Sequence, residues 1–480
     1  MTGPSRLHDP EIGTTSQSQR VISAVTSWLR PNRARPASEE YEPLYEAPTA
    51  LDDEDGMLED EVPFSWLEYS LFAVIGMAML WPWNMFLASA PYFQARFSDS
   101  DWILQNFQSA ILTVSTLTNL IAMFVLTKIQ QTASYPFRMK MAFFIDTAVF
   151  FLLGLSTIVF VDASPSVYLV FTLLMVAIAA LATGLIQNGA FAFSASFARP
   201  EYTQAIMAGQ GVAGVLPSVA QVLISLAAAS KSRNSDTDAS AAQVTSAFFP
   251  FLTAVLVSIG ALVSLVPLVR RHDHIIENRI VERMADSMHS IEEAERASRK
   301  VVGMKVLLQK LFWPASSIFI CFAVAMFFPV FTAKIVSVRL TETDESIGDL
   351  FRPASFIPLA FFFWNLGDLG GRMAAMVPLK VQTQPHALFV ISMLRFGFLP
   401  MYLLCNIGGQ GAAVSSDFFY LFLVQLPFGL TTGWLASSCM MISSECVDEG
   451  EREAAGGFMG LSLVAGLSTG SLLSFSVGGL

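Results

Sequence analysis

The chain has 480 residues, of which 53% are hydrophobic and only 14% are charged, and its formal net charge is −11. Average soluble domains carry roughly 25% charged residues, so this composition excludes an ordinary soluble domain and predicts a polytopic membrane protein. Its apolar runs are about 20 residues long or longer, which suits membrane helices, whereas barrel strands need about 9–11 residues. We therefore expect an all-α protein surrounded by the lipid bilayer.

Residues 1–62 form a polar segment before the first apolar run. From Glu39 to Glu61 this segment holds eleven acidic residues and no Lys or Arg, a number equal in size to the net charge of the whole chain. Such a composition predicts a disordered acidic tail. The tail includes YEPL at residues 41–44, a pattern of the kind that sorting adaptors bind, although a pattern this short also arises by chance.

Eleven apolar segments follow the tail, and one long charged connection separates the first six from the last five. This division is typical of secondary transporters built from two helical bundles. We predict a six-helix bundle over residues 63–270, a charged cytoplasmic loop with a surface helix over 271–310, and a five-helix bundle over 311–480. The predicted spans are 66–92, 103–127, 138–160, 167–197, 203–230, 246–270, 311–335, 352–376, 386–406, 417–443 and 455–477.

The first span contains WPWNMFLASAPYF at residues 81–93, with tryptophans well inside the apolar run rather than at its end. Leu80, Trp83, Asn84 and Leu87 are spaced i, i+3, i+4 and i+7, which places them on one face of a helix. Pro82 removes a backbone hydrogen bond and bends that helix. We therefore expect an aromatic ring and an amide to face a cavity here.

The fourth and fifth spans add polar and small residues at membrane depth. Gln187 and Asn188 lie mid-span in GLIQNG, where an amide can either read the edge of a base or form an interhelical hydrogen bond. Gly209 begins GQGVAG, which formally matches a dinucleotide-binding pattern. No strand–helix unit surrounds this motif, so we assign Gly209 a packing role between membrane helices.

The eighth span carries the richest polar cluster, in FFFWNLGDLGGRMAA. Phe361, Asn365, Asp368 and Arg372 are four, three and four residues apart and so share one stripe of a helix. Asp368 and Arg372 are predicted to form an i,i+4 ion pair. The stripe is interpreted as a solute site, or alternatively as an ion pair that only fixes helix packing. Arg395, an isolated charge in the ninth span, is expected to serve packing or gating.

Patterns for enzymatic chemistry are missing from the sequence. It has no His-Glu-x-x-His or Cys-x-x-Cys pattern and no nucleotide-hydrolysis motif. Asp368 follows Asn-Leu-Gly, so the Gly-x-Gly-Asp pattern of an intramembrane aspartyl protease fails as well. We therefore expect a carrier that is not an enzyme, with no metal site, no cofactor and no nucleic-acid partner.

The distribution of Lys and Arg predicts the orientation in the membrane. The even-numbered loops, which include the long central one, carry most of these residues. This bias places the N-terminus in the cytoplasm. Eleven crossings then place Leu480 on the extracellular or lumenal side.

Together these motifs resemble the equilibrative nucleoside transporter family over about residues 66–477. The resemblance implies a major-facilitator-like fold in a 6+5 arrangement and alternating-access transport of nucleosides, or also nucleobases. Facilitation without coupling is the first choice, and coupling to protons is the second. The alternative is a carrier of the same fold for another small polar solute such as a sugar. The motifs that carry the resemblance are WPWN followed by YF, GLIQNG, IMAGQGVAG, WNLGDLGGR, LRFGFLPMYLLCN and GWLASSCMMISSE.

The resemblance also implies roles for single residues. Trp83 would line the cavity, Gln187 would hydrogen-bond the nucleoside, and Asp368 with Arg372 would form the polar end of the site. Trp81 and Trp364 depart from the family pattern and would narrow the cavity or alter base preference. The acidic tail resembles fungal and intracellular members, which points to a vacuolar or lysosomal membrane, with the plasma membrane as the open alternative. The lining would be completed by Asn365, Phe361, Phe328, Leu80 and Leu87.

Overall fold

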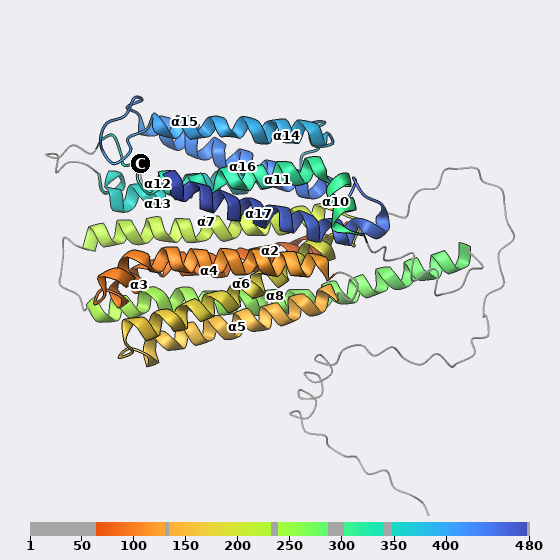
Figure 1. Cartoon of the computed structure of the whole chain (residues 1–480), viewed down its shortest axis with the longest axis horizontal. Coiled ribbons are helices and arrows are strands. Elements are labelled where there is room, and N and C mark those ends of the chain that lie inside the picture. Colours follow the sequence, from red (N-terminus) through yellow and green to blue (C-terminus); the bar gives the residue numbers. More distant parts are fainter. Residues whose placement is uncertain (1–63, 130–133, 232–238, 287–301, 340–347, 478–480) are drawn as a thin grey trace, which may run out of the picture. The chain divides into compact units, whose positions relative to one another are not determined.

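The computed structural model describes residues 64–129, 134–231, 239–286, 302–339 and 348–477, so the predicted acidic tail lies outside the described residues. Within these ranges every named element is helical, which confirms the all-α prediction. Figure 1 shows the long helices running side by side, roughly parallel or antiparallel to one another. The elements of the first half are α2 (Trp66–Ala88), α3 (Ala90–Arg96), α4 (Asp101–Lys128), α5 (Tyr135–Val159), α6 (Pro165–Ala195), α7 (Pro200–Lys231) and α8 (Ala239–Asp286).

The second half contains shorter pieces, because several of its spans are interrupted. The ninth span is divided by a 3₁₀ turn, η2 (Arg395–Gly397), and the tenth begins as a π-helix, η3 (Phe419–Gln425). Two more 3₁₀ turns, η1 (Asp349–Phe351) and η4 (Glu449–Glu451), precede helices. The remaining elements are α10 (Met304–Lys310), α11 (Phe312–Ala325), α12 (Phe327–Thr332), α13 (Pro353–Ala374), α14 (Pro385–Leu394), α15 (Phe398–Leu403), α16 (Leu426–Ile442) and α17 (Arg452–Val477).

Among the described residues, ten helical stretches are long and apolar enough to cross a membrane. They coincide with ten of the eleven predicted spans and confirm an integral, multi-pass membrane protein. The remaining predicted span, the eighth, is α13, which has 22 residues and carries Asp368 and Arg372. It is not one of the ten, although it packs against both α7 and α16. The total of eleven crossings therefore stays a prediction.

The two halves of the chain meet along a few helices. α7 packs on α13 and α16, and α17 packs on α4 and α6. Part of the predicted central loop is helical, as expected, because α8 continues through residue 286 and residues 304–310 form α10. The division into bundles at residues 63–270 and 311–480 remains a prediction.

Close approach of α2 and α7 explains the small residues of the fifth span. A Cβ atom at Gly209 would lie 1.9 Å from the backbone oxygen of Ala73, so only glycine fits this crossing. In lipid, such close backbone contact is a main source of helix–helix stability. Gly209 thus lies where the predicted packing role requires it.

Replacing Gly209 by alanine is expected to destabilise the protein. The added methyl group meets backbone atoms that cannot move aside, and overpacking of this kind costs about 1–3 kcal/mol. Thermal unfolding in detergent measures the effect. The matched control is Gly260→Ala in α8, where a Cβ atom would have nothing within 4 Å. Equal melting temperatures for the two variants would contradict this account of the crossing.

Candidate functional site

A cavity of about 150 Å³ is lined by residues of both halves of the chain. The first half contributes α2, α4, α5 and α6, and the second contributes α17 and the junction of α11 with α12. A cavity bounded by both halves is where a carrier binds its solute in rocking mechanisms. Its lining consists of Met79, Leu80, Pro82, Trp83, Phe86, Leu112, Ser115, Thr116, Asn119, Phe150, Val176, Ala179, Ala180, Thr183, Gln187, Met326, Val464, Leu467 and Ser468.

The lining divides into an apolar wall and a polar strip. Three aromatic rings belong to the wall, those of Trp83, Phe86 and Phe150. The strip comes from neighbouring helices, with Ser115, Thr116 and Asn119 on α4 and Thr183 and Gln187 on α6. A cavity lined by aromatic rings together with a few polar groups suits a flat, polar, heteroaromatic solute.

The residues predicted from the first span separate into two groups. Leu80, Pro82 and Trp83 line the cavity. Asn84 instead binds α7, since its Nδ2 atom donates to the backbone oxygen of Ala213 at 2.8 Å. Leu87 is 52% exposed and lies outside the lining. Of the predicted helix face, Leu80 and Trp83 therefore lie at the cavity. Asn84 forms a contact between helices instead.

The two amides of the fourth span have different partners. Gln187 lines the cavity, and its Oε1 atom accepts a hydrogen bond from Asn119 Nδ2 at 3.2 Å. Asn188 accepts one from Arg138 at 2.6 Å, which ties α6 to α5. Asn119 also lines the cavity and was not among the residues predicted for the site. The available signal was an amide at membrane depth in α4, where polar groups are costly.

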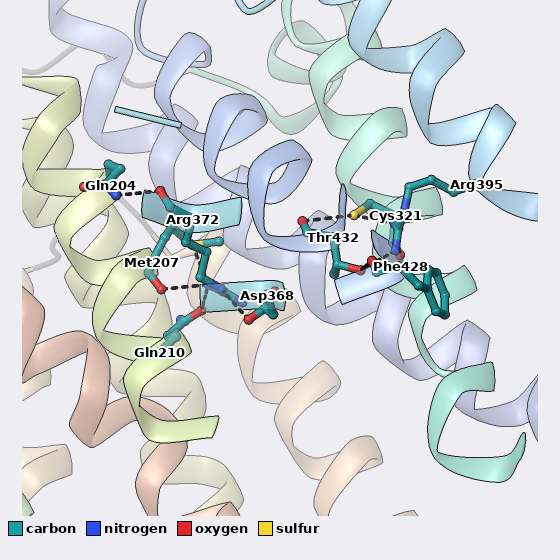
Figure 2. Close-up of polar contacts among 9 residues, drawn as sticks. All are labelled: Gln204, Met207, Gln210, Cys321, Asp368, Arg372, Arg395, Phe428 and Thr432. Atoms are coloured by element: carbon teal, nitrogen blue, oxygen red, sulfur yellow. Dashed lines mark hydrogen bonds and ion pairs between the residues drawn. The ribbon is translucent and has the colours of Figure 1, made fainter. Parts of the chain in front are cut away.

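The eighth-span ion pair forms as predicted, and Figure 2 shows its surroundings. Arg372 Nε lies 2.7 Å from Asp368 Oδ2, and both side chains are buried. The same guanidinium donates to Met207 O at 2.9 Å and Gln210 Oε1 at 3.0 Å, while Gln204 Nε2 donates to Arg372 O at 2.7 Å. In this conformation the pair joins α13 to α7 and is not part of the cavity lining.

The other predicted residues of the second half also lie outside the lining. Asn365 Nδ2 donates to Ser218 Oγ at 2.8 Å, a second contact between α13 and α7. Phe328 stacks on Trp364 with ring centroids 4.2 Å apart and meets Phe361 edge-on at 5.0 Å. These rings form an aromatic cluster between α12 and α13.

Arg395 is buried inside the second half, and Figure 2 shows its polar contacts. Its guanidinium donates to the backbone oxygen and the sulfur of Cys321, both at 2.8 Å, and to Thr432 Oγ1. It also lies 5.0 Å from the centre of the Phe428 ring. The side chain therefore ties η2 to α11 and α16, consistent with the packing role expected for it.

Comparison with known proteins bears on the fold of this chain and on its family. Two solved structures share the fold, the proton:xylose symporter XylE (TM-score 0.54, 13% identity, 85% of this chain and 87% of that one) and human organic anion transporter MFSD10 (0.50, 14%, 87% and 94%). XylE belongs to the major facilitator superfamily, so this likeness confirms the predicted major-facilitator-like fold.

Relatives found by sequence identify the family more specifically than the shared fold does. Nucleoside transporter FUN26 of Saccharomyces cerevisiae is 29% identical over 448 residues, covering 85% of this chain and 83% of the relative. Mouse equilibrative nucleoside transporter 1 is 27% identical, with coverages of 87% and 97%, and human equilibrative nucleoside transporter 2 is 25% identical, with 84% and 95%. The family model described as nucleoside transporter matches residues 173–478, more than half of the chain. The chain therefore belongs to the nucleoside transporter family.

Proposed function

We propose that this protein moves nucleosides across a membrane by alternating access, without needing a coupling ion. The carrying observation is the cavity between the two halves, which is lined both by aromatic rings and by hydroxyl and amide groups. Relatives named equilibrative nucleoside transporters favour simple facilitation and favour nucleosides over a sugar. Likeness to the xylose symporter, at 13% identity, bears on the fold alone.

Within the cavity, we assign the base to the side of Trp83 and the polar edge of the solute to Gln187. An aromatic ring beside a base supplies stacking, and an amide supplies one directional hydrogen bond. Leu80 lines the cavity three residues before Trp83 on the same helix and would shape that wall. Ser115, Thr116 and Thr183 are placed to meet ribose hydroxyls.

In this proposal, the residues that were predicted for the site but lie outside the lining connect the cavity to the movement of the helices. Met79 lines the cavity, and its sulfur accepts a hydrogen bond from Gln210 Nε2 at 2.8 Å. Gln210 in turn accepts from Arg372, the partner of Asp368. Two contacts thus connect the cavity to the α7–α13 junction. We propose that Asn365, Phe361 and Phe328 act through this junction and reach solute only when it rearranges. Leu87, which is 52% exposed, would reach solute only after a separate rearrangement of α2.

Helix contacts indicate which side of the cavity is closed. The beginning of α17 packs on the end of α6, at Gly456 and Phe191, in the direction of the predicted cytoplasmic loops. We propose that this structure is the conformation closed toward the cytoplasm. In the same proposal the N-terminus is cytoplasmic, the membrane is vacuolar, lysosomal or plasma, and the tail offers a site for sorting adaptors.

Uptake of labelled uridine and adenosine into liposomes that contain the purified protein tests the function. We expect uptake that equilibrates at equal pH, and accumulation only with an inward proton gradient would instead indicate proton coupling. Trp83→Ala should lower uptake about tenfold, since stacking is worth roughly 0.5–1.5 kcal/mol beyond the buried area. The control is Trp102→Ala, a 70% exposed tryptophan on α4. Glucose-sensitive uptake, or none, would refute the proposal.

A further inference from the structure

The polar strip of the cavity contains a pair of amides that contact each other across two helices. Asn119 on α4 and Gln187 on α6 both line the cavity, and Asn119 Nδ2 donates to Gln187 Oε1 at 3.2 Å. An amide nitrogen can only donate, and an amide oxygen can only accept. In this contact the oxygen of the Gln187 amide accepts its hydrogen bond from the protein, so the question is what partner its nitrogen has.

The amide nitrogen of Gln187, which can only donate, is the atom that the protein leaves without a partner. Gln187 Nε2 has no hydrogen-bond partner within the part of the chain that the structure describes, although the side chain is only 3% exposed. Because Gln187 lines the cavity, a solute atom is the natural partner for a donor that the protein leaves without one. Gln187 is thus arranged to donate a hydrogen bond to an acceptor atom of the solute.

Close packing of α4 on α6 maintains this arrangement. Gly184, one turn before Gln187, faces Asn119, and a Cβ atom there would lie 3.1 Å from Asn119 Oδ1 and 2.9 Å from Ala122 Cβ. Asn119 Oδ1 is itself buried and has no partner among the described residues. The oxygen of Asn119 therefore lies against Gly184 while its nitrogen meets Gln187.

We infer that Asn119 is a positioning residue that turns the Gln187 amide so that its NH₂ group faces the solute, and that the site thereby selects solutes with a hydrogen-bond acceptor at this point. The acceptor would be a ring nitrogen of the base or an oxygen of the sugar. This inference rests on the proposed nucleoside function, and it concerns a residue outside the motifs by which the family resemblance was found. Without Asn119 the Gln187 amide can rotate and present its oxygen instead.

The test measures discrimination between adenosine and analogues that lack one of its acceptors, either a ring nitrogen or a hydroxyl group, which also donates. Competition with labelled adenosine uptake is measured for 1-deaza-, 3-deaza- and 7-deazaadenosine and for 2′-deoxy- and 3′-deoxyadenosine. In the unaltered protein, loss of one of these acceptors should weaken binding about tenfold, the size expected for one well-placed hydrogen bond. In Asn119→Leu that ratio should fall to within about twofold, while the weakened analogue itself binds as before.

Matched variants separate positioning from a merely structural role. Asn119→Ala should lose the same discrimination, and so should Gln187→Leu, with no further loss when both positions are changed. The control is Asn106→Leu on the same helix, an exposed amide that donates only to Trp102 O, and it should retain the full ratio.

Three results would overturn the inference. The tenfold ratio could persist in both Asn119 variants, all analogues could weaken equally in them, or the unaltered protein could accept every analogue alike while it still transports adenosine. In all three cases the nucleoside function would stand. Absence of adenosine uptake by the unaltered protein would instead remove the proposed function, and the inference with it.

Discussion

Arg372→Ala is expected to abolish nucleoside uptake and to lower the thermal stability of the protein. The substitution leaves the Asp368 carboxylate buried without its cation, and it removes the donor to Met207 O and Gln210 Oε1. Breaking a buried ion pair by removing one partner costs about 3–5 kcal/mol. Melting in detergent and uptake into liposomes at matched protein content measure the two effects.

Removing both charges distinguishes the ion pair from the other contacts of Arg372. In the double variant Asp368→Asn with Arg372→Met, no uncompensated charge stays buried, so most of the stability should return. Uptake should stay low, because the hydrogen bonds to α7 are still missing. Lys380→Ala, at an exposed position in the connection after α13, is the control for loss of a cation. Normal stability and uptake in Arg372→Ala would refute the role of the pair.

Gly456→Val is expected to shift the protein away from the conformation described here. A Cβ atom at Gly456 would lie 2.5 Å from the backbone oxygen of Phe191, so α17 and α6 cannot stay in contact once a side chain is present. The beginning of α17 and the end of α6 then separate, and the population moves toward the state that is open to the predicted cytoplasmic side. Because transport requires both states, uptake should fall about tenfold or more.

Spin labels at Lys128→Cys and Glu445→Cys measure this shift directly. Both positions are exposed, and they lie at the predicted cytoplasmic ends of α4 and α16, one in each half. Distances between the labels should move to longer values in Gly456→Val. Gly370→Ala is the control, because a Cβ atom there has nothing within 4 Å. An unchanged distance distribution in Gly456→Val would show that this contact does not close the cavity.

Helical periodicity predicted the contacts that lie within one helix. The Asp368–Arg372 ion pair follows from a spacing of four residues, and it forms. Leu80 and Trp83, three residues apart, line the same cavity. Ten of the eleven predicted spans likewise follow from apolar runs long enough to cross a bilayer. These features depend on local spacing and on the cost of polar groups in lipid, and both are properties of the amino-acid sequence itself.

Contacts between helices required the tertiary structure. The sequence placed Asn365, Asp368 and Arg372 on one stripe, but only the packing of α13 on α7 shows that this stripe binds another helix in the present conformation. Asn119 and Gln187 are 68 residues apart and meet because α4 lies beside α6. The sequence by itself thus determined the fold class, the family resemblance and the residues of each helix face. Which face meets a neighbour and which meets the cavity was decided by non-local packing, because the rotation of each helix is set by the residues of its partners.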